Sequence, residues 1–147
     1  MGIERNHKIL LVDDDPADQK LIRTAMTRQE LGDNLHSVSS AEEAISYLHY
    51  GENNGGTSFK PDLILLDINM PGMGGKGLLR RLKNDESLRQ IPIIVLTSST
   101  SERDVMDSYK LQAAGFVRKP SSLLELGQVI ENIVKYWFDL CRLPLKE

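Results

Sequence analysis

The sequence predicts an α/β fold in which helices cover both faces of a parallel β-sheet. Short runs of consecutive apolar residues recur along the chain, and segments with helical start signals separate them. Consecutive rather than alternating apolar residues are typical of parallel strands that are buried on both faces. Strands that alternate with helices require right-handed crossovers, which place helices on both sides of the sheet. Together these observations favour a doubly wound sheet.

Five segments are candidates for the strands of this sheet. A weaker one contains Phe116 and Val117, and residues 35–39 are less apolar and therefore read as an edge strand. The three strongly apolar runs are Ile9-Leu10-Leu11-Val12, Leu63-Ile64-Leu65-Leu66 and Ile93-Ile94-Val95-Leu96.

Helix start signals follow four of these strands. Asp15 offers an N-cap, and Pro16 behind it suits the first helical position. Capping-box patterns begin at Ser40, Ser99 and Ser122, because a glutamate follows each of them three residues later. The order of elements is therefore strand and helix in alternation.

The last helix is expected to be unusually long. Apolar residues keep helical spacing from Leu123 to Cys141, which corresponds to a helix of about 28 Å. Residues 51–60 have the glycine-rich and polar composition of a surface loop.

Length and composition favour one soluble domain. A chain of 147 residues with 40% hydrophobic and 27% charged residues has room for one core, expected over residues 7–134, with 135–147 as a helical extension and tail. The formal net charge of −3 does not favour nucleic-acid binding. Neither a signal peptide nor an apolar run near the roughly 20 residues of a membrane span is present. With one cysteine, Cys141, no intramolecular disulfide can form, so we expect a cytoplasmic protein without membrane partners.

Polar side chains follow the apolar runs, at the strand ends where parallel sheets bind ligands. Asp13 and Asp14 follow the first strand, Asp67 the third, Thr97 the fourth and Lys119 the fifth. Two carboxylates about 4 Å apart repel by roughly 4 kcal/mol at an effective dielectric near 20. Three clustered carboxylates must therefore take up protons or bind a cation, and all-oxygen ligands favour Mg²⁺.

Each of these residues also has an ordinary structural explanation. Asp13 and Asp14 alone would be a strand end before a helix cap, Asp67 a turn residue, and Lys119 a surface lysine before a proline. Their common position at one end of different strands is the observation that favours a site.

In the four segments that contain these residues, the chain resembles the response-regulator receiver domains of two-component signalling, of which CheY is a member. The resemblance covers nearly the whole chain and implies a flavodoxin-like (βα)5 fold with strand order 2-1-3-4-5. It also implies phosphorelay signal transduction, in which a sensor histidine kinase phosphorylates an aspartate and the domain switches conformation to signal to a partner. The segments that carry it are Leu11-Val12-Asp13-Asp14, Leu66-Asp67-Ile68-Asn69-Met70-Pro71-Gly72, Val95-Leu96-Thr97-Ser98 and Gly115-Phe116-Val117-Arg118-Lys119-Pro120.

The resemblance implies an acceptor and a metal site. Asp67 corresponds to the phosphoacceptor. The side chains of Asp14 and Asp67 and the backbone carbonyl of Asn69 correspond to Mg²⁺ ligands, and Asp13 is expected to act through water.

The resemblance also implies a switch. Thr97 corresponds to the hydroxyl that reorients toward the new phosphoryl group, and Lys119 to the residue that pairs with another of its oxygens. Phe116 stands at the position of the aromatic switch residue, and Pro120 implies a cis Lys119–Pro120 peptide bond.

Two features resemble one subgroup of the family. The loop at residues 51–60 and the closing segment at 136–144 are similar to those of single-domain receivers that work with phytochrome-type histidine kinases. Trp137 and Phe138 would either cap the domain's own core or become buried in a partner. A homodimer through the fifth helix and the tail is therefore a hypothesis.

Two other functions remain open. Phosphatases of the haloacid-dehalogenase class also use an aspartyl nucleophile and Mg²⁺, but they place a second acid two residues later, where this chain has Asn69. We therefore expect a phosphoacceptor and not an enzyme with a separate substrate. A degenerate receiver that only binds partners is disfavoured by the complete set of acid, hydroxyl and amine side chains.

Overall fold

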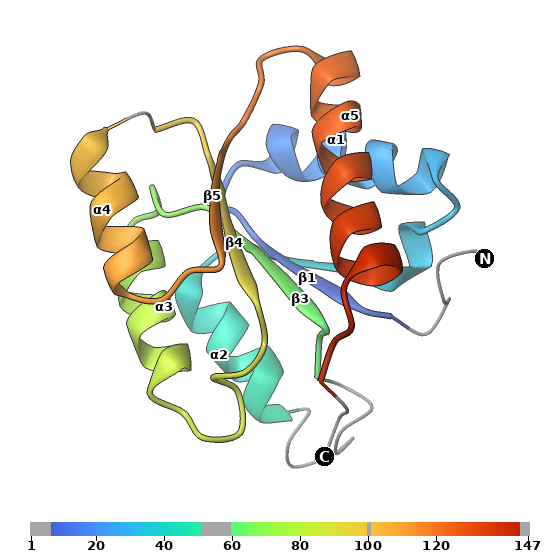
Figure 1. Cartoon of the computed structure of the whole chain (residues 1–147). Coiled ribbons are helices and arrows are strands. Elements are labelled where there is room, and N and C mark those ends of the chain that lie inside the picture. Colours follow the sequence, from blue (N-terminus) through green and yellow to red (C-terminus); the bar gives the residue numbers. More distant parts are fainter. Residues whose placement is uncertain (1–6, 51–59, 100, 145–147) are drawn as a thin grey trace.

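The computed structural model describes residues 7–50, 60–99 and 101–144. Within these residues five parallel strands form one sheet in the order β2-β1-β3-β4-β5, and helices lie on both of its faces (Figure 1). The predicted doubly wound sheet and the strand order implied by the family are confirmed. The strands are β1 (Ile9–Val12), β2 (Leu35–Val38), β3 (Leu63–Leu66), β4 (Ile93–Thr97) and β5 (Gly115–Arg118).

The helices divide the core into two halves. Alternate residues of the central strands pack with α1 and α5 on one face, and the intervening residues pack with α2 and α3 on the other. Helix α4 lies on the same side as α3, next to β5 (Figure 1). Every residue of β1, β3 and β4 is buried, which explains their unbroken apolar sequences. The helices are α1 (Pro16–Arg28), η1 (Gly32–Asn34), α2 (Ala41–Tyr50), α3 (Gly74–Lys83), α4 (Glu102–Lys110), α5 (Leu123–Val134) and η4 (Lys135–Leu140).

Three of the predicted helix caps are confirmed. The side chain of Asp15 accepts a hydrogen bond from the backbone N–H two residues later, and those of Ser40 and Ser122 accept from the N–H three residues later. These bonds satisfy N–H groups that would otherwise lack a partner at a helix start.

The predicted cap at Ser99 is wrong, because Ser101 caps α4. The Ser101 hydroxyl accepts a hydrogen bond from the backbone N–H of Asp104, and the Ser99 hydroxyl donates instead to the Asp104 carboxylate. Ser99 therefore connects the strand end to α4 through a side chain.

The last helix continues past α5, as predicted, but its final turn is a π-helix, η4. The N–H of Cys141 donates to the carbonyl of Tyr136, five residues earlier, at 2.8 Å. This wider turn directs Phe138 inward, where its ring stacks on His7 at a centroid distance of 4.5 Å. Trp137, at the position that regular helical spacing would place inside, is half-buried.

Two other findings concern the chain as a whole. The predicted loop at residues 51–60 lies almost entirely outside the described residues. Within the described part of the chain, no helix combines the length and the apolar character that crossing a bilayer demands.

Candidate functional site

Strand register brings the first two carboxylates together. Val12 and Leu66 are partners across β1 and β3, so Asp13 and Asp67 each stand one residue past the paired strands. The N–H of Asp67 donates to the carbonyl of Val12 at 2.9 Å. The polar edge expected from the strand ends is therefore formed by ordinary parallel pairing.

Three carboxylates meet at this edge. Oxygen atoms of Asp13, Asp14 and Asp67 all lie within 4.8 Å of one another. Asp13 is fully buried, Asp67 is 7% exposed and Asp14 is exposed, so the cluster opens to solvent on one side. Hard oxygen ligands with room for water fit a divalent cation such as Mg²⁺.

The ammonium group of Lys119 stands at the centre of the buried part of the cluster. Its Nζ donates to Oδ2 of Asp13 at 2.6 Å, of Asp18 at 2.8 Å and of Asp67 at 2.9 Å. Burial by itself lowers the pKa of Lys119, but hydrogen bonds to the three carboxylates outweigh burial and the pKa is raised. Lys119 therefore keeps its charge at physiological pH.

One lysine does not balance these acids. Burial raises the pKa of Asp13, and this effect exceeds the opposing hydrogen bonds from Lys119 and from the backbone of Asp15. The nearby charge of Asp67 raises the pKa of Asp13 further. Three carboxylates thus share the Lys119 ammonium, and the Asp14 carboxylate lies beside two of them, so a further positive charge would be bound favourably there.

The other oxygen of Asp67 faces hydrogen-bond donors. Oδ1 accepts from the hydroxyl of Thr97 and from the backbone N–H of Asn69, both at 2.9 Å. Thr97 is fully buried, and its Oγ1 also accepts a longer bond of 3.4 Å from Nδ2 of Asn69. The structure therefore brings together the predicted acceptor, hydroxyl and lysine around one carboxylate.

Phe116 lies on β5 and Pro120 directly follows Lys119, and one expectation about these two residues is wrong. Phe116 is half-buried on β5 and packs against the core on the α2–α3 side. The described residues contain no cis peptide bond, so the Lys119–Pro120 bond is trans. The trans form is intrinsically favoured before proline, and with it Lys119 already reaches all three of its carboxylates.

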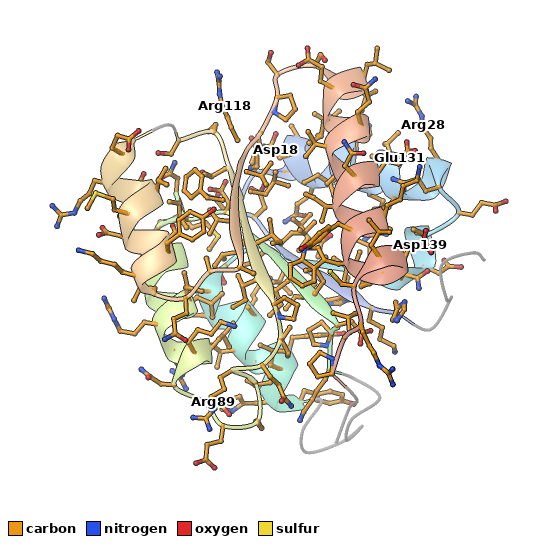
Figure 2. All side chains as sticks on the ribbon, in the orientation of Figure 1. Asp18, Arg28, Arg89, Arg118, Glu131 and Asp139 are labelled. Atoms are coloured by element: carbon orange, nitrogen blue, oxygen red, sulfur yellow. The ribbon has the colours of Figure 1, made fainter. Side chains whose placement is uncertain are left out.

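Asp18 is the site residue that the sequence did not reveal. From the sequence it reads as an acid in the first turn of α1, where the helix dipole favours negative charge. One signal was available, because Asp18 precedes the fully buried Ile22 by four residues and so shares its face of the helix. Figure 2 shows Asp18 close to the segment that leaves β5.

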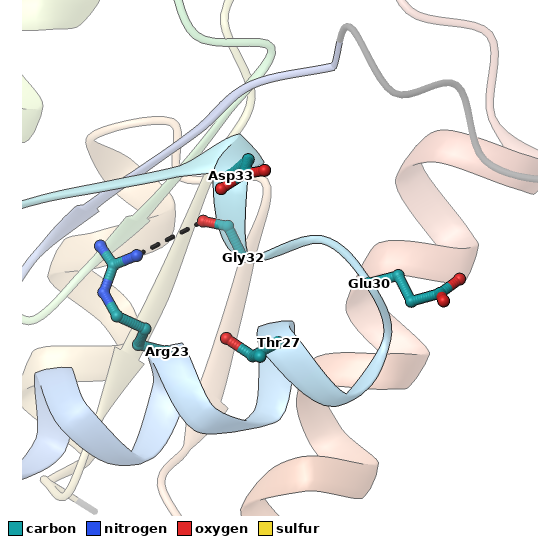
Figure 3. A pocket seen from close by; sticks show the side chains of 5 residues that line it. All are labelled: Arg23, Thr27, Glu30, Gly32 and Asp33. Atoms are coloured by element: carbon teal, nitrogen blue, oxygen red, sulfur yellow. Dashed lines mark hydrogen bonds between the residues drawn. The ribbon is translucent and has the colours of Figure 1, made fainter.

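A separate hollow beside the second half of α1 has no comparable chemistry (Figure 3). Its main polar group, the guanidinium of Arg23, donates to the carbonyls of Gly32 and Leu35 at 3.3 Å each. Arg23 therefore fastens the turn after α1 to the edge strand, and we assign it a structural role.

Comparisons with known proteins agree with the geometry of the site. Residues 9–131 match the family model for the response regulator receiver domain. Response regulator Rcp1 of Synechocystis sp. is 33% identical over 137 residues, which are 92% of each chain. FilR2 of Methanothrix harundinacea, a probable methanogenesis regulatory protein, is 35% identical over 136 residues, 92% of this chain and 86% of its own.

Solved structures of response regulators are also similar to this chain. The phosphorylated cyanobacterial phytochrome response regulator RcpA is similar with a TM-score of 0.85 at 34% identity. The Mn²⁺-bound form of Rcp1 is similar with a TM-score of 0.83 at 31% identity, and each comparison covers 95% of this chain and 99% of the other. The matched range contains every residue of the carboxylate, hydroxyl and lysine cluster, and this chain belongs to the response regulator receiver domain family of two-component signalling.

Proposed function

We propose that Asp67 accepts a phosphoryl group from a sensor histidine kinase and that the chain then signals to a downstream protein by changing conformation. The observation that carries the proposal is the surroundings of Asp67. One of its oxygens accepts from Lys119, and the other accepts from Thr97 and from the backbone of Asn69. Phosphoryl transfer requires this kind of positioning and charge neutralisation, and it requires little covalent chemistry from the protein.

The proposed cation is Mg²⁺. Its ligands would be the carboxylates of Asp14 and Asp67 and the backbone carbonyl of Asn69, with Asp13 acting through water. The cluster of carboxylate oxygens within 4.8 Å supports this assignment, as does the Mn²⁺-bound form of the relative Rcp1. A bound cation supplies positive charge against the phosphoryl oxygens.

The side chains of the protein supply the remaining interactions. A phosphoryl group carries close to two negative charges and three strong acceptor oxygens. Lys119, which keeps its proton, donates to one of these oxygens, and the Thr97 hydroxyl transfers its hydrogen bond from Asp67 Oδ1 to another. Phe116 then repacks against β4 and α4, and this change is the signal that a partner reads.

Labelling with acetyl phosphate tests the assignment of Asp67. With Mg²⁺ the wild type is expected to gain one phosphoryl group, and Asp67→Asn is expected to gain none, by intact-protein mass. Asp33→Asn is the matched control, because it makes the same chemical change at an exposed acid in η1. Labelling that persisted in Asp67→Asn would remove the assignment.

For the kinase, we propose a phytochrome-type sensor histidine kinase. The similarity to Rcp1 and to the phytochrome response regulator RcpA supports this choice. FilR2, which is as similar in sequence, favours a kinase of another class as the second candidate. Phosphotransfer to this chain from one purified kinase of each class decides between them, since the cognate kinase is expected to transfer faster than the other.

We also propose a homodimer formed by α5 and the tail. Leu124, in the first turn of α5, is 70% exposed. Tyr136 and Leu140 on η4 are 53% and 77% exposed, and Trp137 packs edge-on against Tyr136. Exposed apolar side chains grouped on one element favour an interface. Tyr136→Ser combined with Leu140→Ser is expected to convert a dimer to a monomer by light scattering. A mass unchanged by the double substitution would count against this interface.

The remaining proposals concern the kind of protein. We infer that residues 1–147 work as one receiver domain, with a core at about 7–134, and that the domain turns over no separate substrate. Asn69 supports the second point, because it cannot protonate a leaving group as the second acid of a phosphatase does. Release of phosphate from p-nitrophenyl phosphate by the wild type, lost in Asp67→Asn, would contradict it.

A further inference from the structure

Helix α1 contributes a third carboxylate to Lys119, and nothing in the proposed transfer reaction uses it. Oδ2 of Asp18 lies 2.8 Å from Nζ of Lys119, a distance equal within 0.2 Å to those of the two site aspartates. The side chain of Asp18 is 29% exposed, whereas that of Lys119 is only 6% exposed. Asp18 therefore approaches the ammonium from the solvent side of the cluster.

The position of Asp18 is fixed by its own helix. Asp15 caps the start of α1, and Gln19, next to Asp18, donates from Nε2 to the carbonyls of Asp13 and Val38. Gln19 thus ties the first turn of α1 to the ends of β1 and β2. Because the backbone at Asp18 is anchored in this way, its short side chain holds the carboxylate beside Lys119.

The contact between Asp18 and Lys119 matters because the lysine has few hydrogen-bond donors. A lysine ammonium has three N–H donors, and in this structure Asp13, Asp18 and Asp67 take one each. A phosphoryl group on Asp67 would need a hydrogen bond from the same ammonium group. Asp18 holds one of the three donors and part of the positive charge that this phosphoryl group needs.

We propose that Asp18 is a positioning residue that restrains Lys119 and thereby weakens the hold of the site on a phosphoryl group. The inference rests on the proposed roles of Asp67 and Lys119. It differs from the ordinary explanation of Asp18 as a first-turn acid, in which its loss only destabilises α1. A loss of helix stability alone does not make an active site bind an anion more tightly, so the two explanations predict different results.

The experiment measures the affinity of the full chain for beryllofluoride, a stable mimic of the phosphoryl group, with Mg²⁺ present. Asp18→Asn keeps the size of the side chain and removes its charge, and we expect it to bind beryllofluoride about three- to ten-fold more tightly. Asp18→Glu keeps the charge and is expected to lie within about two-fold of the wild type. Asp33→Asn controls for the loss of one negative charge far from Lys119 and is also expected to resemble the wild type.

The outcomes separate this inference from the proposed function. A wild type that does not bind beryllofluoride would overturn the proposed function itself. If the wild type binds, the inference alone is overturned by an Asp18→Asn affinity equal to or weaker than that of the wild type. Equal tightening in Asp18→Glu or Asp33→Asn would overturn it as well, because neither removes the charge beside Lys119. Thermal unfolding of each variant identifies any that fails to fold, and Asp18→Ala then serves as the second charge-removing variant.

Discussion

Nζ of Lys76 lies 2.7 Å from Oδ1 of Asp104, and this ion pair joins helix α3 to helix α4. The other oxygen of Asp104 accepts a hydrogen bond from Ser99, which stands two residues after Thr97. One carboxylate therefore connects the segment after Thr97 to both helices.

Replacement of Lys76 is expected to loosen α4. Lys76→Met keeps the aliphatic stem but removes two ion pairs to α4, one to Asp104 and one to Asp107 at 2.9 Å. Because Lys76 is one-third exposed, we expect a loss of only about 0.5 kcal/mol in unfolding free energy. Amide hydrogen exchange in α4 is expected to become faster. Arg103→Met is the control, since Arg103 is 82% exposed and pairs within α4 only. Unchanged exchange in α4 would show that the pair does not hold the helix.

The same pair gives a pH dependence. The hydrogen bond from Lys76, followed by that from Ser99, holds the pKa of Asp104 below its ordinary value. A depressed pKa means that the stabilisation is present above the unfolded-state pKa and is lost as the pH falls through the folded-state pKa. The stability difference between wild type and Lys76→Met is therefore expected at neutral pH and should vanish in strong acid, as measured by urea unfolding.

Thr97→Ala is expected to separate phosphorylation from switching. The variant loses the 2.9 Å hydrogen bond to Asp67 Oδ1 but keeps Lys119 and the carboxylate cluster. Labelling by acetyl phosphate should proceed within about 100-fold of the wild-type rate, because one hydrogen bond to a charged group contributes roughly 1.5–3 kcal/mol. The change in partner or dimer affinity on phosphorylation should shrink. Thr97→Ser, which retains the hydroxyl, should behave as the wild type, and an undiminished response in Thr97→Ala would refute the role of Thr97.

Asp13→Asn is expected to stabilise the metal-free protein at neutral pH. Burial raises the pKa of Asp13, so its carboxylate binds a proton more tightly in the folded protein than in the unfolded chain. Stability then falls as the pH rises between the unfolded and folded pKa values, and above both the ionised carboxylate is a cost. We expect a gain of about 1 kcal/mol, or roughly 2–4 °C in Tm, at pH 7 with chelator present, and no gain in acid. A Tm that falls at pH 7 would contradict this electrostatic argument.

Gly75→Ala is expected to damage the site through the backbone. A Cβ at Gly75 would overlap Cα of Ile68 and lie 2.6 Å from the carbonyl oxygen of Asp67, and backbone atoms cannot move away as a side chain can. We expect a loss of about 1–3 kcal/mol in unfolding free energy together with slower labelling of Asp67. Gly127→Ala is the opposite control, because its Cβ meets no heavy atom within 4 Å and Ala is favoured in a helix by about 0.5–1 kcal/mol. Equal stability of the two variants would show that α3 can shift without cost.

The sheet and most of the site could be predicted from the sequence for one physical reason. Parallel strands buried on both faces leave their polar residues only at the ends, so Asp13, Asp67, Thr97 and Lys119 had to meet at one edge. The same short segments therefore form the fold and the site, because every predicted strand except β2 also places a site residue at its end.

The predictions that failed depend on competition between side chains. Ser99 fits a capping box, but the carboxylate of Asp104 takes its hydroxyl and Ser101 caps the helix instead. The sequence around Asp18 predicts only an acid at a helix start, whereas the structure shows an ion pair between Asp18 and Lys119, which follows β5. The π-turn that buries Phe138 likewise depends on tertiary contacts, which local sequence patterns do not contain. The cis bond before Pro120 was expected from the family resemblance, and the structure has the intrinsically favoured trans form instead.

The packing of α1 against α5 also affects how the protein is made. These are the first and the last α-helices among the described residues, and both pack on the same face of the sheet. During synthesis on the ribosome the part of that face that α5 covers stays exposed until α5 has left the exit tunnel, although every strand has been translated by then. Completion of this half of the core is therefore a late event that joins the two ends of the molecule, and translation pauses before α5 would prolong exposure to chaperones and to aggregation.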